Sequence, residues 1–167
     1  FKNTAIELMD FSDCGEPNCQ DIFGIGFGSS IYFNNTEIID FSRNDVPGSD
    51  LPQNGERAIW MDGANVYFNN TLIANNLSNC LYDRSLLRLD EGAYVQFNKV
   101  TMVNNNFNCE MFEEEFEPKG LITLDYYDDS QFQNTLIILN SIIWNGLDNE
   151  ITVYAYESHM NPPIILI

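Results

Sequence analysis

The side chains in this chain that could do chemistry are carboxylates, amides and thiols, and histidine is almost absent. The sequence holds 25 Asp and Glu residues against 7 Lys and Arg, a formal net charge of −18, four cysteines and one histidine, His159. Carboxylates are the hard oxygen ligands that Ca²⁺ prefers. Histidine is the commonest general acid or base. The side chains therefore favour cation binding over acid–base catalysis, and we predict no catalytic residue.

Two acidic segments group oxygen ligands around a turn. One contains Asp45 and Asp50, and the other contains Asp125, Asp128 and Asp129. Neither follows the ligand spacing of the EF-hand, in which acidic residues alternate before a glycine. A solvated acidic loop is the favoured interpretation of both segments, and calcium binding is the alternative. No other cofactor is expected.

A short phrase recurs along the chain: Phe, a polar residue, Asn, Thr or Val, a variable residue and an apolar residue, Ile or Met, with Lys99 in place of Asn in one copy. The five phrases begin at residues separated by 32, 35, 29 and 35 positions: Phe1, Phe33, Phe68, Phe97 and Phe132. A repeat of this length is one supersecondary unit that buries its apolar side only by stacking on its neighbours. The phrases favour strands over helix because they are rich in Asn, Thr and aromatic residues. Asn tolerates left-handed backbone angles, so we expect a bend there.

These features predict an all-β chain, a β-solenoid of about five coils with a repeat of 29–35 residues, spanning residues 1–157. Equivalent asparagines should then stack as a ladder at the ~4.8 Å spacing of paired strands. The expected ladder is Asn3, Asn35, Asn70 and Asn134, with Lys99 as the exception. An amide-lined sugar or ion site is the alternative interpretation. A second polar column is suggested by Asn75, Asn76, Asn104, Asn105 and Asn140.

The cysteines predict two disulfide bonds. Cys80 and Cys109 each lie twelve residues after the phenylalanine of a phrase, which would place them on adjacent strands within bonding distance. Cys14 and Cys19 enclose a short loop with Gly and Pro. Zinc is disfavoured because the Cys-x-x-Cys spacing is missing. Disulfides form in oxidising compartments, so we expect a secreted or cell-surface protein.

Three N-glycosylation sequons begin at Asn34, Asn69 and Asn76. Their use is conditional on a host that glycosylates. Asn-rich repeats also generate such sequons by chance.

Composition excludes some partners. A net charge of −18 opposes binding to nucleic acid and to anionic membrane surfaces. No apolar stretch is long enough to span a membrane as a helix. The tail at residues 158–167 is expected to act as a cap or as a strand between subunits, and its assembly residues are Ile164, Ile165, Leu166 and Ile167. Unpaired strand edges at the ends of a solenoid invite self-association along its axis.

The phrase Phe-x-Asn-Thr-x-Ile resembles the right-handed parallel β-helix repeats of bacterial surface proteins, including the chlamydial polymorphic outer-membrane proteins and autotransporter passengers. The segment Asn140–Gly146 is similar to a phrase common in secreted bacterial β-helix proteins. The resemblance implies a right-handed parallel β-helix. Its motifs report coil geometry and therefore imply no single function.

The function expected from these observations is a non-enzymatic extracellular structural or adhesive β-solenoid that associates end to end, with a glycan or cell-surface molecule as a further partner. The alternative is a β-helix that binds or cleaves polysaccharides. That alternative would use Arg57, Arg84 and Arg88 as base or sugar-acid ligands, although we expect them to pair with surface carboxylates. Its aromatic strip would come from Trp60, Tyr126, Tyr127, Trp144, Tyr154 and Tyr156. Trp144 is also twelve residues after Phe132, which predicts a place in the column of Cys80 and Cys109.

Overall fold

The computed structural model describes residues 5–7, 21–40, 57–79, 85–108, 120–126, 132–146, 150–155 and 162–167. In these ranges the chain forms strands joined by turns, and every strand pairing is parallel. The prediction of an all-β chain is confirmed for this part of the molecule. Within the same ranges no helix has the length and hydrophobicity that a bilayer crossing requires.

The described strands form three five-stranded sheets and one strand pair. Sheet 1 contains β2 (Asp21–Ile25), β5 (Arg57–Asp62), β9 (Leu87–Asp90), β13 (Ile122–Tyr126) and β16 (Ile151–Ala155). Sheet 2 contains β3 (Ser30–Asn34), β6 (Asn65–Asn69), β10 (Tyr94–Asn98), β14 (Thr135–Leu139) and β17 (Ile164–Leu166). Sheet 3 contains β1 (Ala5–Glu7), β4 (Glu37–Ile39), β7 (Leu72–Ala74), β11 (Thr101–Val103) and β15 (Ile142–Trp144). The pair is β8 (Leu77–Asn79) with β12 (Asn106–Asn108).

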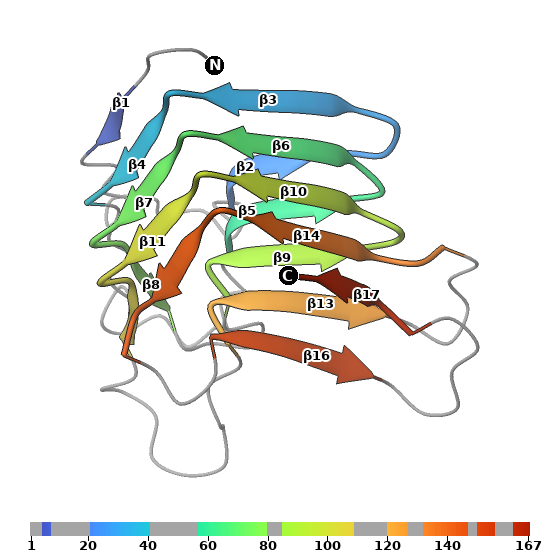
Figure 1. The fold of residues 1–167 in the computed structure, drawn as a ribbon. Coiled ribbons are helices and arrows are strands. Elements are labelled where there is room, and N and C mark those ends of the chain that lie inside the picture. The colour runs from blue at the N-terminus through green and yellow to red at the C-terminus, as the bar shows by residue number, and fades with distance from the viewer. Residues whose placement is uncertain are drawn as a thin grey trace, which may run out of the picture.

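The chain visits the three sheets in the same order again and again. One strand from sheet 1, one from sheet 2 and one from sheet 3 follow each other in sequence, as in β2–β3–β4 and β5–β6–β7. Each strand lies beside the equivalent strand of the next passage, so the passages form successive layers (Figure 1). In every sheet, residues at the same position of the repeat are therefore direct neighbours.

The phenylalanines of three phrases form the centre of the core. Phe33, Phe68 and Phe97 stand opposite each other on β3, β6 and β10, and each has 0% exposure. The rings of Phe33 and Phe68 are stacked with centroids 4.7 Å apart, whereas Phe68 and Phe97 meet edge to face at 5.2 Å. Burying such rings contributes about 1.5–3 kcal/mol each, so this column is a main source of stability.

The fifth phrase does not continue this column, and its predicted place is wrong. Ile138, not Phe132, stands opposite Phe97. Phe132 lies before β14 and remains 49% exposed. The column requires an inward apolar side chain of suitable volume, which an isoleucine supplies as well as a phenylalanine. The true fifth equivalent of the phrase is the segment Ile138–Ile143.

Asn134 is displaced by the same shift, so its predicted membership of the Asn35 column is also wrong. Its neighbour Thr135 stands opposite Tyr94, at the start of β10. The Asn134 side chain is buried, and its Oδ1 accepts hydrogen bonds from the backbone N–H groups of Gly92 at 2.8 Å and Ala93 at 2.9 Å. Its Nδ2 donates to the Leu89 carbonyl at 3.1 Å. Asn134 thus ties the turn after β9 to the next layer.

Candidate functional site

A sharp bend separates sheet 2 from sheet 3 in each layer, at the position of the repeated asparagine. Asn35, Asn70, Lys99 and Asn140 occupy this corner with φ of 51°, 49°, 59° and 51°. The left-handed bend expected within the phrase is confirmed at Asn35, Asn70 and Lys99. Asn140 takes the fourth corner, so its predicted place in the second polar column is wrong; its Nδ2 donates to Asn98 Oδ1 at 3.5 Å at the surface. Asparagine is favoured there because its short polar side chain tolerates this conformation better than other non-glycine residues do.

The corner carries an amide ladder, but an exposed one. Asn70 Nδ2 donates to Asn35 Oδ1 at 2.8 Å, and both side chains face solvent. One position earlier, Asn69 Nδ2 donates to Asn34 Oδ1 at 3.0 Å. Asn3 lies outside the described residues. The ladder therefore joins neighbouring layers at the surface, and the threonines that follow it, Thr36 and Thr71, are the buried polar residues of the corner.

A polar groove runs along this corner over three layers. Its volume is about 330 Å³, and it is lined by Asn35, Thr36, Glu37, Asn70, Thr71, Leu72, Lys99 and Thr101. Amide, hydroxyl, carboxylate and ammonium groups all line the groove. Such a set can donate and accept hydrogen bonds with a hydroxyl-rich ligand, and Glu37 and Lys99 add one charge of each sign.

The buried amide ladder of the molecule lies further along each layer. Asn105 Oδ1 accepts from Asn76 Nδ2 at 2.8 Å and from the Asn76 backbone N–H at 3.1 Å. Asn145 Oδ1 accepts in the same way from Asn105 Nδ2 at 2.8 Å and its backbone N–H at 2.9 Å. The ladder ends on Glu150, whose carboxylate accepts from both nitrogens of Asn145, at 2.6 and 2.7 Å. Asn76 and Asn105 had suggested a second polar column, but Asn145 and Glu150 were missed because only the register reveals them.

The buried ladder includes Asn76, the first residue of one of the three glycosylation sequons. Asn76 is 1% exposed, and its Nδ2 donates to the Ile38 carbonyl at 3.0 Å as well as to Asn105. A glycan attaches to that same nitrogen, so the folded chain cannot carry one at Asn76. Asn34 and Asn69 are half-buried and bonded to each other. Their use as sequons stays a prediction.

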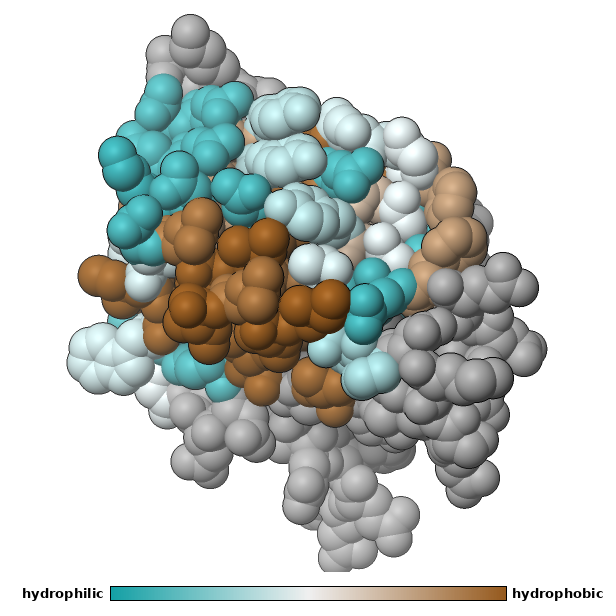
Figure 2. Space-filling model, turned by 45° about the vertical axis from the view of Figure 1, so that its right-hand side comes forward, coloured by the Kyte–Doolittle hydropathy of each residue, from teal (hydrophilic) through white to brown (hydrophobic). Residues whose placement is uncertain are grey.

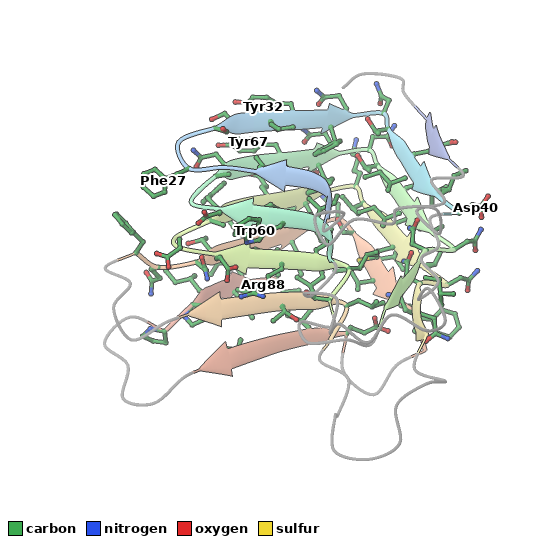
Figure 3. All side chains as sticks on the ribbon, turned by 180° about the vertical axis from the view of Figure 1, so that it is seen from behind. Phe27, Tyr32, Asp40, Trp60, Tyr67 and Arg88 are labelled. Atoms are coloured by element: carbon green, nitrogen blue, oxygen red, sulfur yellow. The ribbon has the colours of Figure 1, made fainter. Side chains whose placement is uncertain are left out.

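An aromatic strip lies on the outer face of sheet 2 and was not anticipated. The rings of Tyr32 and Tyr67 (Figure 3) are stacked with centroids 4.7 Å apart. The ring centroids of Tyr67 and Tyr94 are 5.8 Å apart. Desolvation raises the pKa of the Tyr67 hydroxyl, and the neighbouring Tyr32 and Tyr94 raise it further. The sequence signal was a tyrosine directly before the phenylalanine of two phrases, at the outward position next to a core position.

The aromatic residues named from the sequence occupy different places. Trp60 is half-buried, and its Nε1 donates to Asp90 Oδ2 at 2.8 Å. Trp144 is 73% exposed and stands opposite Val103, so its predicted place in the column of the cysteines is wrong. The side chains of Tyr126 and Tyr154, and residues Tyr127 and Tyr156 altogether, lie outside the described part.

Arg88 does not pair at the surface as expected. Its Nε lies 2.8 Å from Asp90 Oδ2, with both side chains at most 4% exposed (Figure 3). Arg88 and Asp90 are buried on sheet 1 beside the half-buried Trp60, so the Arg88 guanidinium is not presented to a ligand in solvent. Arg84 is outside the described residues, and the side chain of Arg57 is not described.

The remaining predicted sites fall mostly outside the described ranges. These are the four cysteines (Cys14, Cys19, Cys80 and Cys109) and the acidic residues Asp45, Asp50, Asp128 and Asp129. Asp125 is placed within β13, without a described side chain. In the ranges that are described, no three His, Cys, Asp or Glu side chains are grouped to hold a metal ion.

The C-terminal residues form a strand that pairs with another strand of the same chain. Ile164, Ile165 and Leu166 of β17 pair with Thr135, Leu136 and Ile137 of β14. Ile167 follows and is 93% exposed. This segment extends sheet 2 by one strand and leaves the far side of β17 at the edge of the sheet.

The chain matches no protein-family model, no curated protein and no solved structure.

Proposed function

We propose that this chain is a β-solenoid that serves as a non-enzymatic structural or adhesive unit outside the cell, associating end to end within a fibre or a longer surface protein. The observation that carries the proposal is the layered pairing of three parallel sheets whose end strands keep one side unpaired within the described residues. Unpaired edges of parallel strands are templates for further strands.

The stacking chemistry supports a stiff unit. Phenylalanines stack inside, two amide ladders join the layers, and Asn134 ties a turn to the layer beyond it. Among the described strands, each layer pairs with its neighbours through equivalent positions of the repeat. A secreted or surface location is consistent with the cysteine content of the chain.

Imaging tests this proposal directly. Purified protein is examined by negative-stain electron microscopy and by sedimentation velocity over a range of salt concentrations. The formal charge of −18 makes copies repel, so association should grow as salt screens the charge. Filaments or rod-shaped oligomers are the expected result. A chain that stays monomeric at all salt and protein concentrations tested would remove the proposal.

A polysaccharide-binding role is the second candidate, and the corner groove with its adjoining tyrosines favours it. Tyr32 and Tyr67 lie on the strands that lead into the corner, so aromatic and amide groups share one region. Glycan-array screening with neutral and acidic polysaccharides tests this role. Binding that is lost in Asn70→Gly, which removes the amide while keeping the left-handed bend, would support it; binding to no glycan would exclude it.

A further inference from the structure

The exposed amide ladder at the corner is interrupted at Lys99. Asn70 Nδ2 donates to Asn35 Oδ1, so a continued ladder would have the next residue of the column donate to Asn70 Oδ1. Lys99 takes that place, and among the described residues no hydrogen bond joins it to Asn70. The Asn70 oxygen and the Lys99 ammonium group therefore both keep hydrogen-bonding capacity for another molecule.

Lysine is also an unfavourable residue at this bend. Its φ is 59°, in the left-handed region that asparagine tolerates and that most other side chains adopt only at a cost in stability. Backbone conformations of this kind gather at functional sites. The exchange of asparagine for lysine at this one corner thus points to a function of the ammonium group.

Lys99 lies in the last of the three layers that line the corner groove, and Glu37 lies in the first. The outward column beside the groove runs from Glu37 through Leu72 to Thr101, so the carboxylate is two layers, roughly 10 Å, from the layer of Lys99. Both charged side chains are exposed, and within the part of the chain that the structure describes neither forms an ion pair. The groove thus presents one negative and one positive group at a defined separation, with amides and hydroxyls between them.

The polar lining ends at the next layer. Ile142 follows Thr101 in the outward column and is 59% exposed. Figure 2 shows hydrophilic side chains gathered in one area and apolar side chains in the area beside it. With a volume of about 330 Å³ and three polar layers, the groove suits a short segment of a longer molecule.

We propose that the corner groove binds a zwitterionic segment of a glycan, with an amino group of one sugar beside Glu37 and a carboxylate of another beside Lys99. This inference rests on the polysaccharide-binding role, the second candidate above, and specifies the charge pattern of its ligand. Leu72 offers an apolar surface to a sugar ring, and Asn70 and Thr101 bind its hydroxyl groups.

The charge of the whole chain selects among glycans. A net charge of −18 repels a polyanion at long range, and the single lysine of the groove does not reverse that field. A polycation would be drawn to carboxylates elsewhere on the chain and opposed in the groove by Lys99. A segment with one charge of each sign is not repelled, and it satisfies both Glu37 and Lys99.

The groove is less suited to a peptide of the same charges. Peptides that bind β-sheets pair with the free backbone groups of an edge strand. At this corner the backbone N–H groups of Asn35, Asn70 and Lys99 already donate to carbonyls of the next layer, at 3.0, 2.9 and 3.0 Å. Recognition here therefore depends on side chains, as the binding of hydroxyl-rich ligands does.

Titration calorimetry with defined oligosaccharides tests the charge pattern. The probe is a tetrasaccharide of alternating glucosamine and glucuronic acid, which carries amino groups and carboxylates. One matched form has its amino groups acetylated, and the other has its carboxylates reduced to alcohols. We expect the zwitterionic form to bind, and each matched form to bind about fivefold more weakly or worse, because each lacks one charge-assisted hydrogen bond.

Two variants assign the contacts. Lys99→Asn restores the residue of the other corners, so its unfolding temperature should equal or exceed that of the parent while its affinity falls about fivefold or more. Glu37→Gln should lose affinity to a similar extent. The two changes alter the net charge in opposite directions, so long-range electrostatics cannot explain a loss in both. Asp40→Asn, at an exposed carboxylate that does not line the groove, is the control and should bind like the parent.

Parental affinity in Lys99→Asn, or a lower unfolding temperature of this variant, would overturn the role of the ammonium group. Equal affinity for the three forms of the tetrasaccharide would overturn the zwitterionic ligand and leave polysaccharide binding intact. Tighter binding of an acetylated, amidated tetrapeptide that contains one lysine and one glutamate would show that the groove takes peptides. No binding of any tetrasaccharide would overturn the inference, and an empty glycan array in addition would remove the polysaccharide-binding role.

Discussion

Phe27 and Phe132 pack edge to face across the turns that join sheet 1 to sheet 2, with ring centroids 5.6 Å apart. They come from distant parts of the sequence. Each ring lies against a glycine of a turn with positive φ: Phe27 against Gly63, and Phe132 against Gly92. The two rings are 66% and 49% exposed, so they cover the turns from outside and are not part of the core. The missing side chains of the glycines make room for them.

Gly63→Ala should therefore destabilise the protein by about 1.5–3.5 kcal/mol. The added Cβ would lie 2.1 Å from Phe27 Cδ2, and the backbone φ of +58° is unfavourable for alanine. The left-handed conformation costs about 1–2 kcal/mol, and displacing the ring loses about 0.5–1.5 kcal/mol of its contact with Phe132. Urea unfolding of the variant measures the sum.

Two further variants separate these terms. In the Phe27→Ala background, Gly63→Ala should cost only the backbone term. Gly146→Ala has a φ of +75° with no heavy atom near the added Cβ, so it should also cost only that term. Equal losses for Gly63→Ala in both backgrounds would refute the steric role of Phe27.

Asn105 is the central member of the buried ladder, and its truncation to alanine should cost about 3 kcal/mol or more. The change removes the acceptor for two nitrogens of Asn76 and the donor to the Ile73 carbonyl and to Asn145. Each buried polar group left without a partner costs about 1–3 kcal/mol. Asn70→Gly, which deletes an exposed ladder amide, should cost under about 1 kcal/mol, and thermal unfolding compares the two. Similar losses would mean that burial does not set the strength of these ladders.

The acidic turn after β9 should make stability depend on pH. Desolvation raises the pKa of Glu91 above its ordinary value of 4.5, and the carboxylates of Asp62 and Asp90 raise it further. The folded state thus holds the Glu91 proton more tightly than the unfolded state does. The stability that this protonation contributes is fully present below the pKa of Glu91 in the unfolded chain. It is lost as the pH rises through the higher pKa of Glu91 in the folded protein.

Glu91→Gln removes the ionisable group and with it the loss of stability at higher pH. We expect the variant to be more stable than the parent at about pH 7, with the difference vanishing below about pH 4, as measured by thermal unfolding across this range. Glu37→Gln deletes one charge at the exposed corner and controls for net charge. A difference between Glu91→Gln and the parent that is the same at every pH would contradict the assignment.

The buried pair of Arg88 and Asp90 should respond asymmetrically to substitution. Arg88→Met leaves the Asp90 carboxylate buried without its cation, which typically costs about 3–5 kcal/mol. Arg88→Met/Asp90→Leu removes both charges, so it should recover most of that loss. Urea unfolding of the single and double variants measures the coupling. A double variant as unstable as the single one would show that the loss comes from packing.

Local chemistry made part of the fold predictable. The left-handed bend at Asn35 and Asn70 follows from a single residue's conformational preference, and the Phe33–Phe68–Phe97 column follows from the recurrence of the phenylalanine in the phrase. Both the bend and the column can be predicted without knowing which residues lie beside them in space.

What depends on register was not predictable. Phe132 matched the phrase, yet Ile138 fills the core position because that position selects volume and direction and not residue type. Asn145 and Glu150 join the ladder only through their neighbours in space. The burial of Arg88 beside Asp90 and Trp60 depends on neighbours in space, and no local pattern in the sequence reports it.

The predicted disulfide between Cys80 and Cys109 can be tested on stronger grounds than spacing alone. Both cysteines lie outside the described residues, but β8 and β12 pair in parallel up to Asn79 opposite Asn108, the residues directly before them. Strands in this register hold facing Cα atoms about 4.8 Å apart, within the 4.4–6.8 Å range of disulfides.

We expect non-reducing peptide mapping to recover Cys80 and Cys109 in one linked peptide, separate from a peptide that holds Cys14 and Cys19. The Cys80→Ser/Cys109→Ser variant should lose about 2–4 kcal/mol of stability, because the bond closes a loop of roughly thirty residues in the unfolded chain. A Cys14–Cys19 bond would close a much shorter loop, so the Cys14→Ser/Cys19→Ser variant should lose less stability. Linkage of Cys80 to Cys14 or Cys19 would refute the predicted pair.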